Sequence, residues 1–265
     1  MKQPTLAASP QGHDASTSGE WRTVALMALG FALVNLDRFI MYPLFPVMAR
    51  ELTLDYQDIG LISAAVALTW GLSSMVFGRL SDRIGKRGIL VTAVLVFSVL
   101  CGVSGLAMGL GSLLMIRAVM GVFEGAFVPV SIATVLGASS PKNVGRNTGI
   151  QQLMAPLVGN AIAPVLAVFL LHALPSWRWV FVVTALPGLL CAWLIWKHLA
   201  EPERAAPQES AATQVPAPLR KVFSYPNVAL CSAGILSIAA WILRASAGWP
   251  GAGYLNSYDS FGKPP

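Results

Sequence analysis

Six long runs of apolar residues, separated by short polar or Gly/Pro-rich breaks, make up most of this chain. A bilayer core about 30 Å thick is crossed by a helix of roughly 20 apolar residues, and each run reaches that length. The runs are approximately Arg22–Met48, Ile59–Leu80, Gly88–Met108, Leu113–Ala138, Thr148–Leu171 and Trp179–Leu199. A seventh run begins near Asn227 and loses its apolar character after Leu243. The pattern predicts an all-α membrane protein with a six-helix bundle and a partial seventh helix.

Composition excludes an ordinary soluble domain. The 265 residues are 55% hydrophobic and only 11% charged, whereas soluble domains are about a quarter charged. The formal net charge of +6 comes from Lys and Arg residues clustered between the apolar runs rather than along one basic face, so nucleic acid is not an expected partner. Cys101, Cys191 and Cys231 lie far apart inside apolar runs without metal-ligand spacing. No metal and no cofactor are expected.

The basic clusters indicate how the chain is oriented. Cytoplasmic loops carry an excess of Lys and Arg, which places the loop between the second and third runs inside. Alternation then places the N-terminus in the cytoplasm and the protein in the plasma membrane, the inner membrane if the source is bacterial. The predicted organisation is a cytoplasmic tail, the bundle, a polar linker, the partial seventh helix and an irregular tail, with the approximate bounds 1–20, 21–200, 201–222, 223–243 and 244–265.

The loop after the second run has a physical reason for each of its marked positions. Gly78 permits close helix approach, Asp82 can cap the next helix, and Gly85 supplies a tight turn. The basic residues suit anionic lipid head groups, although a generic positively charged inside loop would have the same composition. The stretch from Gly78 to Arg87 closely resembles the signature loop of the major facilitator superfamily, G-x-L-x-D-R-x-G-R/K-R/K, in its residues Gly78, Asp82, Arg83, Gly85, Lys86 and Arg87.

This resemblance, together with six spans and a long linker, implies a transporter in which two six-helix bundles alternate around a central site. The loop residues would then act in the conformational change. Only one bundle is recognisable in this chain.

Four ionisable residues fall inside the apolar runs: Asp37, Arg38, Arg117 and Glu124. A charge at bilayer depth costs several kcal/mol unless it faces a partner or a wet cavity, so each is a functional candidate. Arg117 and Glu124 are two helical turns apart, about 10 Å along one face. They can therefore line one cavity. Internal salt bridges that only hold the bundle together remain the alternative.

The chemistry of these residues favours uptake of an organic anion with protons. A guanidinium has a planar fork suited to a carboxylate, and burial away from water favours the protonated form of an acid. The segments Leu36-Asp37-Arg38 and Arg117-x-x-x-Gly121-x-x-Glu124-Gly125 resemble the anion:cation symporter family. That resemblance implies that Arg38 and Arg117 bind the substrate carboxylate and that Asp37 and Glu124 take the protons.

Two more residues are candidates for contact with the substrate. Tyr42 in the first run could stack on a ligand, and Asn160 in the fifth could donate a hydrogen bond. Aromatic residues in membrane spans are more often core or interfacial anchors, and an amide there often bonds a neighbouring helix. The expected partners are an organic anion such as a sugar acid, protons and the lipid bilayer, with self-association of half-bundles as a further expectation.

After Leu243 the chain becomes polar and rich in Gly and Pro. This change suggests a frameshift or premature stop, which would leave a truncated transporter that is inactive alone. A competing function is a non-transporting membrane receptor or regulator built on the same bundle. An enzyme ranks last, because the sequence has no nucleophile motif, metal cluster or glycine-rich phosphate loop in a cytoplasmic segment.

Overall fold

The computed structural model describes residues 17–199, and these are helical nearly throughout. In chain order the helices are α1 (Thr17–Leu52), α2 (Tyr56–Ile84), α3 (Lys86–Ser104), α4 (Leu110–Ala138), α5 (Val144–Met154), η1 (Ala155–Ile162), α6 (Ala163–Ala173) and α7 (Trp177–His198). The π-helix η1 joins α5 to α6, so these three form one span. The described residues thus contain six helical spans long and apolar enough to cross a bilayer, and the predicted multi-pass bundle is confirmed.

The helix ends agree with the apolar runs except at one place. Five runs lie within an observed span to within one residue, but α3 ends at Ser104 rather than near Met108. The physical reason is a long-range contact, because Arg178 of α7 donates to the backbone oxygens of Gly105 and Ala107 at 2.8 Å each. The predicted linker, partial seventh helix and irregular tail lie outside the described residues.

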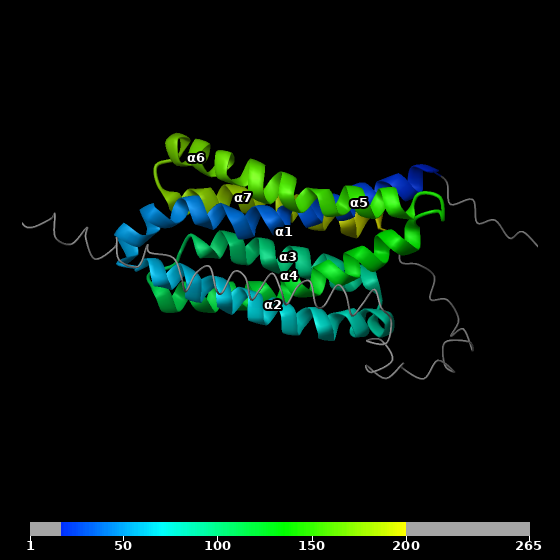
Figure 1. Ribbon diagram of the computed structural model, residues 1–265, viewed down its shortest axis with the longest axis horizontal. Helices are drawn as coiled ribbons and strands as arrows, with labels where there is room; N and C mark the ends of the chain where they lie inside the picture. Colours follow the sequence, from blue (N-terminus) through cyan, green and yellow to red (C-terminus); the bar gives the residue numbers. More distant parts are fainter. Residues whose placement is uncertain (1–16, 200–265) are drawn as a thin grey trace, which may run out of the picture. The chain divides into compact units, whose positions relative to one another are not determined.

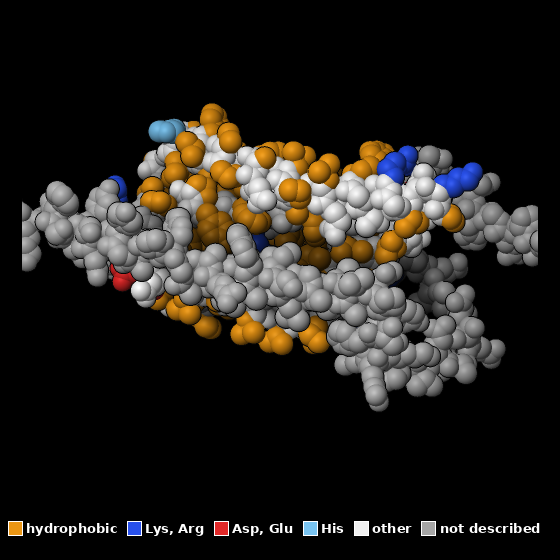
Figure 2. Space-filling model, viewed as in Figure 1, with side chains coloured by type: hydrophobic (Ala, Val, Ile, Leu, Met, Phe, Trp, Pro, Cys, Tyr) orange, Lys and Arg blue, Asp and Glu red, His pale blue; other side chains and the backbone are white. Residues whose placement is uncertain are grey.

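Successive spans run in alternating directions (Figure 1). The start of α1, the α2–α3 and α4–α5 connections and the end of α7 therefore meet at one end, which we call the basic end. Figure 2 shows Lys and Arg side chains at this right-hand end, with hydrophobic side chains along the rest of the visible face. The basic residues near it are Arg22, Arg79, Lys86, Arg87, Lys142, Arg146 and Lys197.

The signature loop forms the turn that its sequence predicts. Gly85 has a φ of 103°, a backbone conformation that favours glycine. Lys86 Nζ then donates to the oxygen of Ala133 at 3.2 Å, and Arg87 Nη2 donates to the oxygen of Trp196. The start of α3 is thereby tied to the C-terminal ends of α4 and α7, where carbonyl groups attract cations. These two residues bind the protein backbone rather than only facing lipid as expected, and the Asp82 and Arg83 side chains are not described.

Helices α2 and α4 pack closely because α4 has glycine where they meet. A Cβ atom on Gly121 would lie 2.8 Å from the oxygen of Val66, and one on Gly125 would lie 2.9 Å from Cα of Trp70. Gly78 was expected to serve this purpose, but a Cβ there would meet Pro129 Cβ at 3.9 Å, an ordinary contact. The close approach therefore depends on the two glycines of α4.

At the opposite end, Glu51 joins α1 to α7. Its carboxylate accepts from Trp177 Nε1 at 2.5 Å and from Arg178 Nη2 at 2.9 Å. The Arg178 guanidinium also lies over the Trp177 ring, 4.5 Å from its centroid. Because Arg178 also binds the α3–α4 connection, this group, which we call the Glu51 clasp, links three parts of the bundle.

Replacing Gly125 with alanine should destabilise the bundle by about 1–3 kcal/mol, because the new methyl group overlaps the α2 backbone. The matched control is Gly137→Ala on the same helix, where a Cβ would meet nothing within 4 Å. Thermal unfolding of the purified protein in detergent measures the difference. Equal melting temperatures for the two variants would show that α2 and α4 are not in close contact.

Replacing Glu51 with alanine should also lower the melting temperature, because Trp177 and Arg178 would lose their shared acceptor. Arg50→Ala, a truncation of the exposed neighbouring residue, should leave it nearly unchanged. The two variants are compared in the same detergent. A clasp without structural importance would give matching melting curves.

Candidate functional site

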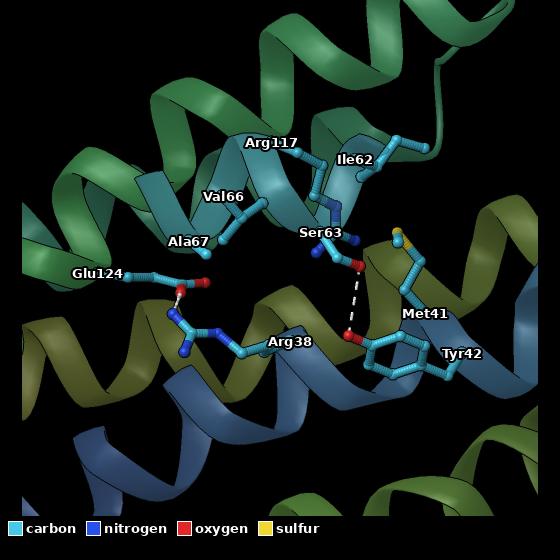
Figure 3. Close-up of a pocket in the computed structure, with 9 residues that line it drawn as sticks. All are labelled: Arg38, Met41, Tyr42, Ile62, Ser63, Val66, Ala67, Arg117 and Glu124. Carbon is cyan, nitrogen blue, oxygen red and sulfur yellow. Dashed lines mark hydrogen bonds and ion pairs between the residues drawn. The ribbon is translucent and has the colours of Figure 1, made fainter. Parts of the chain in front are cut away.

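A cavity of about 260 Å³ lies between α1, α2 and α4, partway along their length (Figure 3). It exists because α2 packs along α4 but barely touches α1, so side chains alone close the space between α1 and α2. The residues that line it are Arg38, Met41, Tyr42, Ile62, Ser63, Val66, Ala67, Arg117 and Glu124.

The four predicted charges form two ion pairs between α1 and α4. Arg38 Nη2 lies 2.7 Å from Glu124 Oε2, and Arg117 Nη1 lies 3.5 Å from Asp37 Oδ2. Arg117 also donates to the backbone oxygen of Asp37 at 3.3 Å. Asp37 and Arg38 are neighbours in sequence, yet their side chains reach different partners, since adjacent positions on a helix point about 100° apart.

The two pairs differ in their access to the cavity. The side chains of Asp37 and Arg117 are 5% and 3% exposed, and Asp37 does not line the cavity. Arg38 is 30% exposed, while its partner Glu124 is 1% exposed. Among the four charges, Arg38 is therefore the one that a ligand in the cavity reaches first.

Neither pair uses all of its hydrogen-bonding atoms. Arg117 Nε and Nη2 and Glu124 Oε1 are buried and have no hydrogen-bond partner among the described residues. A buried polar atom left in this state costs free energy unless water or a ligand bonds it. The site thus has both donor and acceptor atoms available to something that enters the cavity.

Each guanidinium also lies on an aromatic ring. Arg38 Cζ is 5.3 Å from the Trp70 ring centroid, and Arg117 Cζ is 5.2 Å from that of Phe181. Such cation–π contacts attract the guanidinium to the ring face and help to hold it in place. Phe181 comes from α7, and no feature of the sequence indicated its contact with Arg117.

Cys101 of α3 contacts the same residue, Phe181, whose ring lies against Arg117. Its thiol lies 3.5 Å from both the backbone oxygen of Phe181 and Thr184 Oγ1. Arg117 therefore borders the cavity on one side and the Phe181 ring of α7 on another.

The remaining predicted site residues fall in different places. Tyr42 lines the cavity, and its hydroxyl lies 3.3 Å from Ser63 Oγ on α2. Asn160 lies exposed on η1 and does not line the cavity. The signature-loop residues lie at the basic end. Within residues 17–199, no group of three or more potential metal ligands occurs.

Sequence reasoning missed the α2 wall of the cavity. Ser63, Val66 and Ala67 line the cavity, and Val66 and Ala67 follow Ser63 by three and four residues, so the three share one face of α2. That face combines a hydroxyl with small apolar groups. The periodicity was available as a signal, but nothing in it distinguishes a cavity wall from a lipid-facing or packed surface.

Six membrane-length helices, three of which enclose a cavity bordered by paired charges, define a polytopic membrane protein. The model of the Major Facilitator Superfamily matches residues 27–260, and the chain belongs to this family of membrane transporters. Among curated relatives, the uncharacterized MFS-type transporter Rv1250 of Mycobacterium tuberculosis is 26% identical over 66% of this chain. The putative multidrug resistance protein MdtD of Escherichia coli O6:K15:H31 is 30% identical over 68%.

Solved structures show the same fold. A bacterial homolog of the human lysosomal transporter Spinster, inward-facing and unoccupied, matches 71% of this chain with 21% identity and a TM-score of 0.63. The human organic anion transporter MFSD10 matches 69% with 20% identity and a TM-score of 0.57. The matches cover 45% and 48% of those chains. The chain spans about a third of the curated relatives, 31% of Rv1250 and 37% of MdtD.

Proposed function

We propose that this chain is the N-terminal bundle of a proton-coupled symporter for organic anions, of the anion:cation symporter type. The proposal rests on the two ion pairs between α1 and α4. One of them, Arg38–Glu124, borders the cavity. Alternating access in this superfamily uses two bundles. The proposal for transport therefore concerns this bundle together with a second one, and the proposal for binding concerns the cavity described here.

Arg38 is the proposed primary anion ligand. Its guanidinium is partly exposed to the cavity, and Trp70 supports it from one side. Arg117 adds Nε and Nη2, which are buried and unpaired. Two guanidinium groups from different helices can hold the two oxygens of a carboxylate, which is acceptor-only and matches their donors.

Charge balance supplies the reason for a coupled proton. The four side chains, three of them buried and Arg38 partly exposed, carry two positive and two negative charges, so the site is neutral before an anion enters. An anion alone would leave one uncompensated charge in a low-dielectric environment, which is costly. A proton on Glu124 removes that charge and also frees Arg38 from its ion pair. Anion and proton therefore bind together.

Asp37 is the proposed second proton acceptor. It is held by Arg117, which is also a ligand of the anion in this scheme. When the anion draws Arg117 away, the Asp37 carboxylate loses its partner and is more easily protonated. The alternative role, a fixed structural pair, predicts that Asp37 keeps its charge throughout the cycle.

We further propose that the basic end faces the cytoplasm of a plasma membrane, the inner membrane in a bacterium. The signature loop lies at this end, as do most of the basic side chains of the described residues. The excess of Lys and Arg on cytoplasmic loops supports this orientation. Since α1 starts there, its N-terminus would be cytoplasmic.

Arg38→Ala should weaken binding of organic acids to the purified 265-residue chain in lipid nanodiscs, because the cavity would lose its accessible guanidinium. Removal of a charged hydrogen-bond partner costs about 1.5–3 kcal/mol, or roughly 10- to 150-fold in affinity. Arg50→Ala on the exposed end of the same helix is the control and should bind normally. Calorimetry with a panel of carboxylates gives the affinities. Equal affinity in both variants would refute the anion site.

Acid binding should tighten as pH falls, by up to about tenfold per pH unit, because anion and proton bind together. Glu124→Gln mimics the protonated acid and should bind the anion at neutral pH with a weaker pH dependence, because Asp37 remains as the second proton acceptor. Glu51→Gln, which changes a charge far from the cavity, should retain it. Proteoliposome uptake by a chain that joins this bundle to a second one then separates the two functional classes. Binding without any accumulation would favour a membrane receptor or regulator over a transporter.

A further inference from the structure

A second cavity, of about 330 Å³, lies at the basic end between the starts of α1 and α5. Its lining residues are Glu20, Trp21, Arg146 and Ile150, none of which borders the cavity between α1, α2 and α4. All four lie within the first two turns of their membrane-length spans, and Trp21 is 53% exposed. Tryptophan at a span end is typical of the bilayer interface, where phospholipid head groups lie. This second cavity is therefore within reach of a lipid head group.

The second cavity has two opposite charges that do not pair with each other. Glu20 is 6% exposed, and its Oε1 accepts from Asn147 Nδ2 at 2.6 Å. Arg146 donates from Nε and Nη2 to Asn147 Oδ1, at 3.3 Å each. Neither Glu20 nor Arg146 forms an ion pair with another described residue. The Asn147 amide therefore stands between the carboxylate and the guanidinium.

Asn147 keeps these two charges apart at a fixed place in the bundle. Its side chain is buried, and Nδ2 also donates to Ser139 Oγ, just past the end of α4, at 2.9 Å. The amide is thus bonded to groups from α1 and from the α4–α5 connection. Because the two charges are separated by only one amide group, one small ligand can contact both.

A zwitterion with an amine and a phosphate matches this arrangement. A primary ammonium has three N–H donors for Glu20, whose carboxylate can accept more bonds than the one from Asn147. A phosphate accepts from guanidinium groups, and Arg146 has Nη1 that Asn147 does not use. A purely anionic head group would bring its charge close to Glu20, and a quaternary ammonium has no N–H to donate. Trp21 and Ile150 supply an apolar wall for attached hydrocarbon.

We propose that Glu20, Trp21 and Arg146 form a binding site for a phospholipid with a zwitterionic, primary-amine head group, such as phosphatidylethanolamine. The ammonium bonds to Glu20, the phosphate bonds to Arg146, and the glycerol and acyl chains lie along Trp21 and Ile150. The bound lipid joins the start of α1 to the start of α5 and so adds to the link that Asn147 makes. This site is independent of the proposed transport of organic anions.

Native mass spectrometry of the purified 265-residue chain in detergent measures which lipids it retains. Phosphatidylethanolamine, phosphatidylcholine and phosphatidylglycerol with identical acyl chains are compared. The variants are Arg146→Gln and Glu20→Gln, which still offers an oxygen to Asn147. Arg22→Gln is the matched control, because Arg22 is exposed at the same end and does not line the second cavity. Thermal unfolding checks that each variant folds, and Arg146→Gln, at an exposed position, tests the site even if Glu20→Gln unfolds.

The original chain should retain phosphatidylethanolamine in preference to the other two lipids. Glu20→Gln should reduce its preference over phosphatidylcholine, and Arg146→Gln should reduce the affinity for phosphatidylethanolamine, each by about two- to tenfold, the worth of one net hydrogen bond. Arg22→Gln should change neither quantity. The site is refuted if the original chain shows no preference, or if Arg22→Gln and Arg146→Gln lose the lipid equally.

Free phosphoethanolamine distinguishes a lipid from a soluble zwitterion with the same head group. At a concentration equal to that of the lipid it should displace little of it, because it lacks the hydrocarbon that Trp21 and Ile150 contact. Complete displacement would overturn the lipid assignment and make the second cavity a site for a soluble zwitterion.

Discussion

Four ionisable side chains inside an apolar bundle are the constraint on which the rest of this structure depends. Each would be costly alone at bilayer depth, and all are compensated by pairing between α1 and α4. The pairing also fixes geometry. Because adjacent residues of α1 must reach Glu124 and Arg117, which are two turns apart on α4, α1 can take only one rotation about its axis. The charges therefore set the register of the two helices as well as the chemistry of the cavity.

The cavity follows from unequal packing around α4. Gly121 and Gly125 bring the α2 backbone against α4, and this draws α2 away from α1. The space left between α1 and α2 is crossed by side chains from both helices, among them Arg38 from α1 and Ser63 from α2. The same two glycines flank Glu124 in sequence. The close α2–α4 contact and the buried carboxylate are thus parts of one local arrangement, and a side chain at Gly125 would disturb both.

Features encoded locally were predicted well from the sequence. Apolar runs gave the six spans, Gly85 gave the turn before α3, and the charges of the first and fourth runs proved to meet in space. Contacts between distant segments were not predictable in this way. The early end of α3 depends on Arg178, about seventy residues later in the chain. The carbonyl partners of Lys86 and Arg87 are equally remote, and composition could only suggest lipid for them.

The site residues follow the same division. Charges inside apolar runs are rare enough to identify Asp37, Arg38, Arg117 and Glu124 without a structure. Ser63 and Phe181 are residue types common in membrane spans, so only their position next to Tyr42 and Arg117 sets them apart. Asn160, a candidate because of its polarity, is exposed on η1 and does not line the cavity between α1, α2 and α4. Its contact with a substrate stays a prediction.

The π-helical segment η1 completes the support of α1. Pro156 and Pro164 lack the N–H groups needed to continue regular helical bonding, and the chain between them adopts a wider turn. This segment brings Gly159 against α1 so closely that a Cβ there would lie 2.7 Å from the Phe39 ring. Phe39 directly follows Asp37 and Arg38 in sequence. Around residues 37–39, helix α1 is therefore held by ion pairs with α4 and by the Phe39–Gly159 contact with η1. A change in either contact must alter the rotation of α1, and with it the distance from Arg38 to Glu124.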